Sequence, residues 1–589
     1  MERMAPCMAG GIPSTPSFIA TMFSPQQAHS SSMMSDALAG SGRDPDIGPD
    51  WHACRPPQAA PNLFVMSRGD NAMRDITATI RPRRRGVLAG GLALPMLGAG
   101  SEIASAQQAR DTLRIVFRDG VPNVDPYFNS QRTGLILAHQ GWDCLVHRDP
   151  NDFSFKPLLA TAWNWVDTTT IDFTLRQGVT FHNGDPFTAD DVVYTFNTVA
   201  NPETRTATPS NYSWIDRAEK TGDFSVRVHL KRPTPAALEY FSLVYPIWPK
   251  AYRERVGADG YARAPVAAGP YKIVANNPGA SIEFERHEGY YADSPKGKPA
   301  IRRLAVRFVP DAATELTELL SGRTDWIWNI NPDQMPNLER LPNFRVARQE
   351  SMRVGYMTID SAGRTGAGNP LTKLPVRKAI LHAIDRNAIA TRLVQGGSRV
   401  PPAPCYPSQF GCDAEAAVQY DYDPNKAKAL LAEAGFPNGF DTEIVSYVLP
   451  QWGSAVQNYL QAVGIRARLT QLQVAAAIQR SQEGRAPLYL GSWGSYSVND
   501  ASSFMPTWFG GGGDDYFRDA ETIRLLEEGG STNDEAARRR AYSAAIRRVT
   551  EQAAFVPINT YVNTYGYVRN LEFQTWRDEL PRFYWAKWR

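Results

Sequence analysis

The most regular pattern of apolar and polar positions lies between residues 171 and 199. Apolar side chains alternate with polar ones over 171–175, which predicts a half-buried strand. Turn-forming residues cluster at 183–186, and Thr188 with Asp191 three positions later has the spacing of a capping box. The apolar residues that follow fall on one face of a helix: Val192, Val193, Phe196 and Val199. The stretch therefore predicts a compact strand-turn-helix unit.

A second pattern alternates strands with a helix. The residues of 301–309 predict a strand, those of 311–320 a short helix, and those of 322–328 the next strand. Strand-helix-strand order is typical of a parallel α/β sheet, whose ligands bind at the carboxyl ends of the strands. Trp328 and Asn329 fall near such an end, so we expect them to contact a ligand.

Helical periodicity returns in the last third of the chain. Asp385 can cap a helix after it, and Asp423 can cap one over 426–434 that stops at Gly435. The helix that we expect before Asp385 has one apolar face, made of Val376, Ile380, Leu381 and Ile384.

Several of these stretches have the wording of a known family. Residues 173–196 read F-T-L-R-Q-G-V-T-F-H-N-G-D-P-F-T-A-D-D-V-V-Y-T-F, which resembles the signature of the family 5 extracellular solute-binding proteins. These are the dipeptide, oligopeptide and nickel-type receptors of ABC importers. Residues 157–163 (P-L-L-A-T-A-W), 269–271 (G-P-Y) and 376–386 (V-R-K-A-I-L-H-A-I-D-R) match further pieces of that family, and the resemblance covers residues 110 to 589.

The resemblance implies an α/β fold, that of a periplasmic binding protein of cluster C type. It consists of two lobes joined by crossing hinge strands, with an extra subdomain. We expect lobe I to comprise 107–150, 265–350 and 560–589, with the subdomain 151–264 inserted in it. Lobe II would comprise 351–559.

The N-terminal residues have a different character. Residues 1–72 lack periodicity, which favours either disorder or a mis-assigned start, with Met66 or Met73 as the better start. Residues 73–106 have the order of a signal peptide: arginines, a short apolar stretch, and Ala104-Ser105-Ala106 as the cleavage site. Arg84-Arg85 resembles the twin-arginine export motif, and general secretion is the alternative. We therefore expect a periplasmic protein whose signal is removed near Ala106.

Composition and charge are those of an ordinary globular protein. The chain has 589 residues, 43% of them hydrophobic and 21% charged, and a formal net charge of +3. No basic run follows the signal, so we expect no nucleic-acid partner. We also expect no cofactor. A chain of this length predicts two or three lobes, and we expect it to act as a monomer.

The principal candidate site follows an apolar strand that begins at Leu488. The loop after this strand combines aromatic and polar groups, as expected of a ligand site, and the alternative is an ordinary surface turn. Its candidate ligand-binding residues are Trp493, Tyr496, Asn499, Asp500 and Phe504. Peptide receptors that resemble this chain usually carry an Asp shortly after the Trp, which pairs with the α-ammonium group of the ligand. Here Tyr496 stands near that position, and Asp500 could serve only if the loop shifts.

Two further candidates follow the first strand. Tyr127 and Asn129 lie in a stretch equivalent to the "L-D-P" opening of the family, whose loop lies near the ligand. An ordinary polar loop is the alternative.

Cysteine and histidine positions indicate structure rather than chemistry. Cys405 and Cys412 are close in sequence, and in an oxidising compartment they could form a small-loop disulfide. We expect Cys144 to be a buried free thiol. His182 has no partner at ligand spacing, so we expect a structural role for it and no metal site.

The function that the resemblance implies is that of a receptor. We expect a protein that binds a peptide-like solute between closing lobes and delivers it to ABC permease subunits at the inner membrane. A nickel chelate, an opine or an oligosaccharide are the alternative solutes. The more distant alternative is a secreted hydrolase, but no G-x-S-x-G or H-E-x-x-H motif occurs, so we expect no enzyme.

Overall fold

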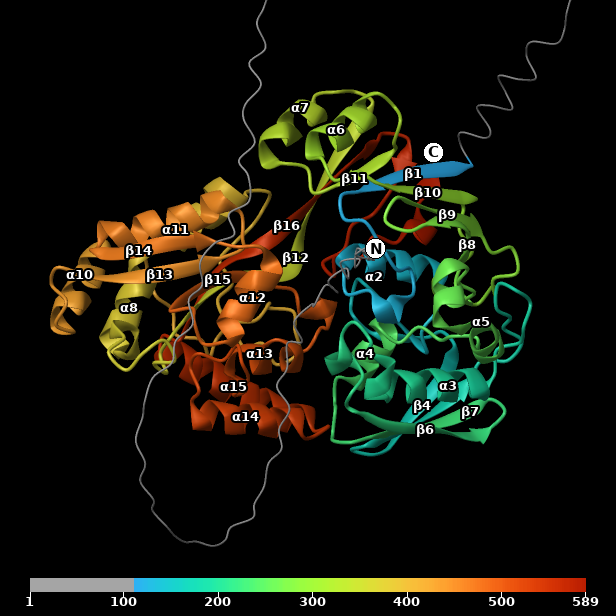
Figure 1. The fold of residues 1–589 in the computed structure, drawn as a ribbon, viewed down its shortest axis with the longest axis horizontal. Helices are drawn as coiled ribbons and strands as arrows, with labels where there is room; N and C mark the ends of the chain where they lie inside the picture. Colours follow the sequence, from blue (N-terminus) through green and yellow to red (C-terminus); the bar gives the residue numbers. More distant parts are fainter. Residues whose placement is uncertain (1–110) are drawn as a thin grey trace, which may run out of the picture. The chain divides into compact units, whose positions relative to one another are not determined.

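The computed structural model describes residues 111–589 (Figure 1). The 1–72 stretch, the signal segment 73–106 and its cleavage site lie outside the described residues. Within them, the strand-turn-helix prediction is confirmed by β5 (Thr170–Leu175) and α3 (Ala189–Ala200). The capping box is complete: the Thr188 hydroxyl accepts from the amide of Asp190, and the Asp191 carboxylate accepts from the amide of Thr188 at 2.9 Å.

A ten-stranded sheet organises the described chain, in the order β14-β13-β15-β12-β16-β11-β1-β10-β9-β8. Strand β1 runs parallel to both β10 and β11, with α6 (Ala312–Leu320) between these two in sequence, as the strand-helix-strand pattern predicted. The sheet is mixed, however, because β12 and β16 pair with antiparallel neighbours. The strands are β1 (Thr112–Phe117), β8 (Tyr271–Asn277), β9 (Ser281–Arg286), β10 (Arg303–Phe308), β11 (Trp326–Trp328), β12 (Phe344–Ile359), β13 (Phe440–Ser446), β14 (Ile465–Gln471), β15 (Leu488–Trp493) and β16 (Phe555–Val568).

The two longest strands join the halves of this sheet. Strand β12 has 16 residues and β16 has 14, and they pair with each other over most of their length. The C-terminal end of β16 pairs with β11 of lobe I. The C-terminal end of β12 pairs with β15 of lobe II. The two strands are therefore the crossing hinge strands that join two lobes. Their register shifts between Glu350 and Val354, which is a bulge at the crossing.

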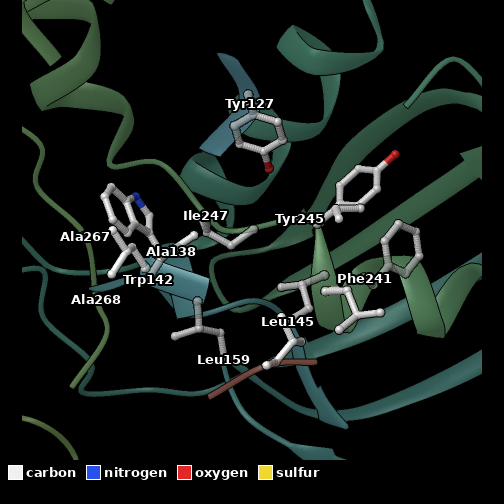
Figure 2. Packing of buried hydrophobic residues seen from close by; sticks show 14 of the residues in the cluster. Tyr127, Ala138, Trp142, Leu145, Leu159, Phe241, Tyr245, Ile247, Ala267 and Ala268 are labelled. Atoms are coloured by element: carbon white, nitrogen blue, oxygen red, sulfur yellow. The ribbon is translucent and has the colours of Figure 1, made fainter. Parts of the chain in front are cut away.

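A separate four-stranded sheet has the order β4-β5-β7-β6, and α3 packs against it. Its strands are β4 (Ala160–Asp167), β5, β7 (Ser225–Leu230) and β6 (Ile215–Gly222), and α4 (Ala237–Leu243) and α5 (Lys250–Arg263) follow. Side chains from this region and from lobe I form one continuous core, which contains Leu159 and Phe241 together with Trp142 and Leu145 (Figure 2). The residue boundaries of the two lobes and of the inserted subdomain (151 and 264) stay predictions.

The helices of lobe II follow their predicted caps. Asp385 accepts a hydrogen bond from the amide of Ala388 at 2.8 Å, and Asp423 accepts from the amides of Asn425 and Lys426. Helix α10 ends before Gly435, whose φ of 89° is left-handed. The helices are α8 (Leu374–Ala383), α9 (Arg386–Ala388), α10 (Pro424–Glu433), α11 (Pro450–Ala462), α12 (Val474–Gln482), α13 (Met505–Phe509), α14 (Ala520–Gly530) and α15 (Glu535–Glu551).

The remaining α-helices and β-strands of the described residues lie mainly in lobe I and near the C-terminus. They are α2 (Arg132–Gly141), α7 (Met335–Glu339), β2 (Val146–Arg148), β3 (Phe155–Pro157), β17 (Leu571–Glu572) and β18 (Lys587–Trp588). None of the described helices is both long and apolar enough to cross a membrane.

Candidate ligand-binding site

Side chains from three distant segments meet beside the loop that follows β15. Arg132 begins α2 of lobe I, Arg353 lies in the bulge of the crossing strand β12, and Glu579 follows β17. Nη2 of each arginine lies 3.2 Å from the same oxygen, Oε2 of Glu579. We call Arg132 and Arg353 the arginine pair. Because a bulge re-aims side chains, the irregular register of β12 accounts for the direction in which Arg353 points.

The 494–500 loop of lobe II lies directly against the arginine pair. A Cβ atom built on Gly494 would be 3.3 Å from Nη2 of Arg353 and 3.6 Å from Nη2 of Arg132. The Arg132 guanidinium also donates to the Ser497 hydroxyl at 2.7 Å. The site is therefore assembled from both lobes and from a strand that crosses between them.

The electrostatic balance of this group is uneven. Burial would raise the pKa of Glu579, but Arg353 and Arg132 lower it to about 2, so this carboxylate is ionised at neutral pH. Burial lowers the pKa of Arg132 because desolvation disfavours its charged form, and the attraction of Glu579 offsets only part of this effect. Two guanidinium groups thus share one carboxylate. Their side chains remain 16% and 26% exposed, compared with 4% for Glu579, so the excess positive charge can be reached by a ligand.

Aromatic side chains line the same place. The rings of Trp493 and Tyr496 meet edge to face with centroids 4.9 Å apart. The guanidinium carbon of Arg353 lies 5.9 Å from the ring centroid of Tyr561, on strand β16. Large aromatic walls with a few fixed charged groups are typical of small-ligand sites.

Comparisons with known proteins agree with this architecture. Residues 154–516, well over half of the chain, match the model of the bacterial extracellular solute-binding proteins, family 5 Middle. The chain belongs to this family.

This solute-binding protein is similar to individual family members along most of its length. Heme-binding protein A of Haemophilus influenzae is 26% identical, over 72% of this chain and 82% of that protein. Di/tripeptide-binding protein 1 of Pseudomonas aeruginosa is 25% identical, over 81% of this chain and 94% of that protein. The structure of the periplasmic binding protein DppA from Helicobacter pylori, in complex with the peptide STSA, superposes with a TM-score of 0.69 at 22% identity, covering 82% of this chain and 99% of that one.

The structure places the sequence-predicted residues of the 494–500 loop in different surroundings. Trp493 and Tyr496 are half-buried beside the arginine pair. The backbone amide of Asn499 donates to Glu239 at 2.9 Å, so this residue connects the loop with helix α4.

Asp500 and Phe504 lie away from the arginine pair, inside lobe II. Both carboxylate oxygens of Asp500 accept from Nη2 of Arg538 at 2.8 Å, and the two side chains are each only 6% exposed. Phe504 is fully buried and packs edge to face on Tyr356. An Asp500 that is already paired with an internal arginine is not available to an ammonium group without losing that partner.

The residues from the first predicted loop also make internal contacts. Tyr127 (Figure 2) is fully buried, and its hydroxyl donates to the carbonyl of Pro246 at 2.7 Å. The side-chain oxygen of Asn129 accepts from the amide of Gln131, and its side-chain amide donates to the carbonyl of Asn123. Helix α2, which follows this loop, brings Arg132 to the site instead.

Trp328 and Asn329 lie at the end of β11, as predicted. Trp328 stacks on Tyr565 and is 8% exposed, and its indole N–H has no hydrogen-bond partner among residues 111–589. Asn329 is exposed with a left-handed φ of 56°, and its amide donates to the carbonyl of Thr564. The described contacts of these two residues include none with the arginine pair.

Sequence reasoning missed Arg132, Arg353 and Glu579. Arg353 and Glu579 are 226 positions apart, and no local motif marks any of the three. Their chemistry appears only when the crossing strands and the C-terminal segment are in place.

The predicted disulfide is present: the structure joins Cys405 and Cys412. Cys144 is a buried free thiol whose pKa burial raises to about 12, so it stays protonated. The expected structural role of His182 also holds. Its Nδ1 accepts from the amide of Ala267, so Nε2 carries the proton and donates to the carbonyl of Gly269 at 3.0 Å. Burial lowers the pKa of His182 to about 3, and the described residues contain no cluster able to hold a metal ion.

Proposed function

We propose that this protein is a periplasmic receptor that captures a carboxylate-bearing, peptide-like solute between its lobes and delivers it to an ABC permease. The observation that carries the choice of solute is the arginine pair, in which two guanidinium groups share the single carboxylate of Glu579. The planar fork of a guanidinium matches a carboxylate in a bidentate manner, so the excess positive charge favours an acidic group on the ligand.

Family membership supports the receptor part of this proposal. The two relatives named for peptides bind molecules that end in a carboxylate. The aromatic side chains of Trp493 and Tyr496 would cover the remainder of such a ligand. The one carboxylate of this group, Glu579, is already paired with both arginines, which favours recognition of the carboxylate end of the solute.

The lobes supply the mechanism of capture. Lobe I contributes Arg132, the crossing strand contributes Arg353, and lobe II contributes the 494–500 loop. A ligand that contacts all three favours the closed arrangement by its greater affinity for that state, and hinge motion about β12 and β16 provides the closure. The protein acts as an exported monomer in this proposal, and its closed form docks on the permease subunits.

The test is calorimetric titration of the mature chain from Gln107 with dipeptides and with the same dipeptides as C-terminal amides. We expect binding of the free acids and a large loss with the amides. Arg353→Gln should weaken binding of the free acid by about ten- to hundredfold, because a hydrogen bond to a charged group contributes about 1.5–3 kcal/mol. Arg524→Gln is the matched control, since Arg524 lies on α14 with its side chain 57% exposed.

The other solute classes are separate arms of the same titration. An opine and a histidine chelate of nickel carry carboxylates, whereas a neutral oligosaccharide does not. Binding of the oligosaccharide alone, or equal affinity for acid and amide, would overturn the proposed role of the arginine pair. Binding of an opine in place of peptides would keep the arginine pair and change the solute.

A further inference from the structure

The 494–500 loop has a backbone that L-residues adopt only under constraint. Ser495, Tyr496 and Ser497 have φ angles of 46°, 51° and 67°, three successive non-glycine residues in the left-handed region. Each costs free energy because its Cβ crowds the following carbonyl oxygen. Such conformations persist only where the surroundings over-determine them, and they gather at ligand clamps and switches.

Lobe II alone provides part of that constraint. The Ser495 hydroxyl accepts from the side-chain amide of Gln409 at 2.8 Å, and the amide of Ser497 donates to the carbonyl of Gly494 at 2.7 Å. Both bonds stay within the loop and its own lobe. They hold the beginning of the left-handed run and leave the carbonyl of Ser497 and the amide of Asn499 without a partner from lobe II.

The other lobe fills these two positions. Nη1 of Arg148, the last residue of β2, donates to the carbonyl of Ser497 at 2.5 Å. Oε2 of Glu239, on helix α4, accepts from the amide of Asn499 at 2.9 Å. Arg148 also donates to Glu239, so one ion pair grips the loop at both a carbonyl and an amide.

This ion pair is supported without the loop. Nη2 of Arg148 lies 3.1 Å from Asp578, and Arg582 also pairs with Asp578. Burial would raise the pKa of Asp578, but Arg582 and Arg148 hold it well below its usual range. The Arg148 and Glu239 side chains are 1% and 9% exposed, so both charges are desolvated and depend on these partners. The ion pair therefore has a charged partner, Asp578, that does not belong to the loop.

We propose that Arg148 and Glu239 are positioning residues, a latch that grips the 494–500 loop when the lobes close and so holds Tyr496 and Trp493 against the arginine pair. Neither residue belongs to the arginine pair, and neither needs to touch the solute. The left-handed run stores free energy that the latch offsets only in the closed arrangement, so the loop relaxes when the lobes separate. The latch keeps a fraction of the molecules closed without a solute, and a bound solute raises that fraction. The latch rests on the proposed function in one respect: it assumes that the lobes close around a solute.

The first experiment needs no solute. We expect the backbone amides of the loop to exchange with deuterated water about tenfold faster in Glu239→Ala than in the unmodified protein, because the Asn499 amide loses its acceptor. Glu239→Gln keeps an oxygen acceptor and should restore most of the protection. Asp125→Asn is the matched control: the Asp125–Arg253 pair is equally buried, with side chains 1% and 5% exposed, but it makes no contact with the loop. It should leave the exchange of the loop unchanged.

The second experiment measures release of alanyl-phenylalanine by stopped-flow tryptophan fluorescence. Glu239→Ala and Arg148→Gln should raise the dissociation rate at least about tenfold with a smaller change in the association rate, since loss of a closed-state contact acts mainly on dissociation. If Arg148→Gln does not fold, the Glu239 variants decide the question.

The two proposals fail in different ways. Unchanged exchange of the loop in Glu239→Ala would overturn the latch, whether or not a solute binds. Unchanged release of the dipeptide by Glu239→Ala, with Arg353→Gln still weakening binding, would also overturn the latch but keep the proposed function. Faster exchange without binding of any carboxylate would keep the latch and overturn the proposed solute.

Discussion

Arg132 and Arg353 approach the same carboxylate oxygen, Oε2 of Glu579, each at 3.2 Å. One arginine begins a helix of lobe I and the other lies in a crossing strand, so a single carboxylate ties a lobe to the hinge. Because one negative charge balances only one of the two guanidinium groups, an excess of positive charge remains at this place.

A small substitution at Gly494 should disturb ligand binding without lowering the stability of the protein. A methyl group on Gly494 would lie 3.3 Å from Nη2 of Arg353, which is tight but requires only a small shift of a side-chain tip. We expect Gly494→Ala to lower the affinity for a carboxylate solute by about tenfold, because displacing a charged donor weakens its hydrogen bonds. Calorimetric titration with a dipeptide measures the effect.

Gly512→Ala is the control for this substitution, since a Cβ at Gly512 would meet no atom within 4 Å. It should leave both affinity and melting temperature unchanged. Equal affinities of the Gly494→Ala variant and the unmodified protein would argue against contact between the solute and the arginine pair.

Asp500 should be important for stability rather than for solute selection. Its carboxylate is paired with Arg538 in a setting where both side chains are 6% exposed. Removing one partner of a buried pair leaves the other charge unpaired and typically costs about 3–5 kcal/mol. We expect Asp500→Ala to lower the melting temperature by several degrees, measured by scanning calorimetry.

Arg538→Ala should destabilise the protein to a similar extent, since it breaks the same pair from the other side. One result for Asp500→Ala would contradict this structural role: an unchanged melting temperature together with lost affinity for peptides that have a free amine. That result would make Asp500 the ammonium anchor that the sequence alone suggested.

The disulfide between Cys405 and Cys412 should contribute measurably to stability. The two cysteines are 7 positions apart in sequence. In the chain-entropy model, closing a loop of that length lowers the entropy of the unfolded chain and so raises the free energy of unfolding by about 2–3 kcal/mol. We expect a reducing agent to lower the melting temperature of the unmodified protein in differential scanning fluorimetry. The Cys405→Ala/Cys412→Ala double variant should melt lower and should not respond to the reducing agent. A response of the double variant equal to that of the unmodified protein would assign the effect to something other than this bond.

Asp514 should make the stability of lobe II depend on pH. Burial raises its pKa to about 6, and one carboxylate oxygen has no hydrogen-bond partner among the described residues. The unfolded chain has an aspartate pKa of about 3.9, so between these values the folded state binds the proton more tightly. The stabilising contribution is therefore complete below about pH 3.9 and is lost as the pH rises through about 6.

Asp514→Asn has no proton to lose, and its side-chain oxygen can still accept from Gln482, as Asp514 does. We expect the variant to gain melting temperature over the unmodified protein near pH 7.5 and to show no gain near pH 4, because only the ionised aspartate is penalised by burial. Scanning calorimetry at the two pH values measures this. The same difference at both pH values would mean that Asp514 does not titrate in this range.

Local features of this protein were predictable because their causes lie within a few residues. The capping box of Thr188 and Asp191 spans three positions, and the apolar alternation of β5 repeats every second residue. The caps at Asp385 and Asp423 use backbone amides two or three residues away. The Cys405–Cys412 bond also follows from proximity in sequence. The family signature added the two-lobe architecture, which local patterns alone do not determine.

The site required the tertiary structure. Aromatic and polar residues in a loop read as ligand contacts, but Tyr127 and Phe504 turned out to be buried, because packing and not residue type decides which face of a loop turns inward. The partner of Asp500, Arg538, lies 38 positions away on helix α15. Arg132, Arg353 and Glu579 come from segments whose meeting depends on the crossing strands and on the C-terminal segment. By itself the sequence determined the elements and the family, since these depend on short-range hydrogen bonds and periodic burial. Only the folded chain decided which charges share one carboxylate, since such contacts depend on how distant elements pack.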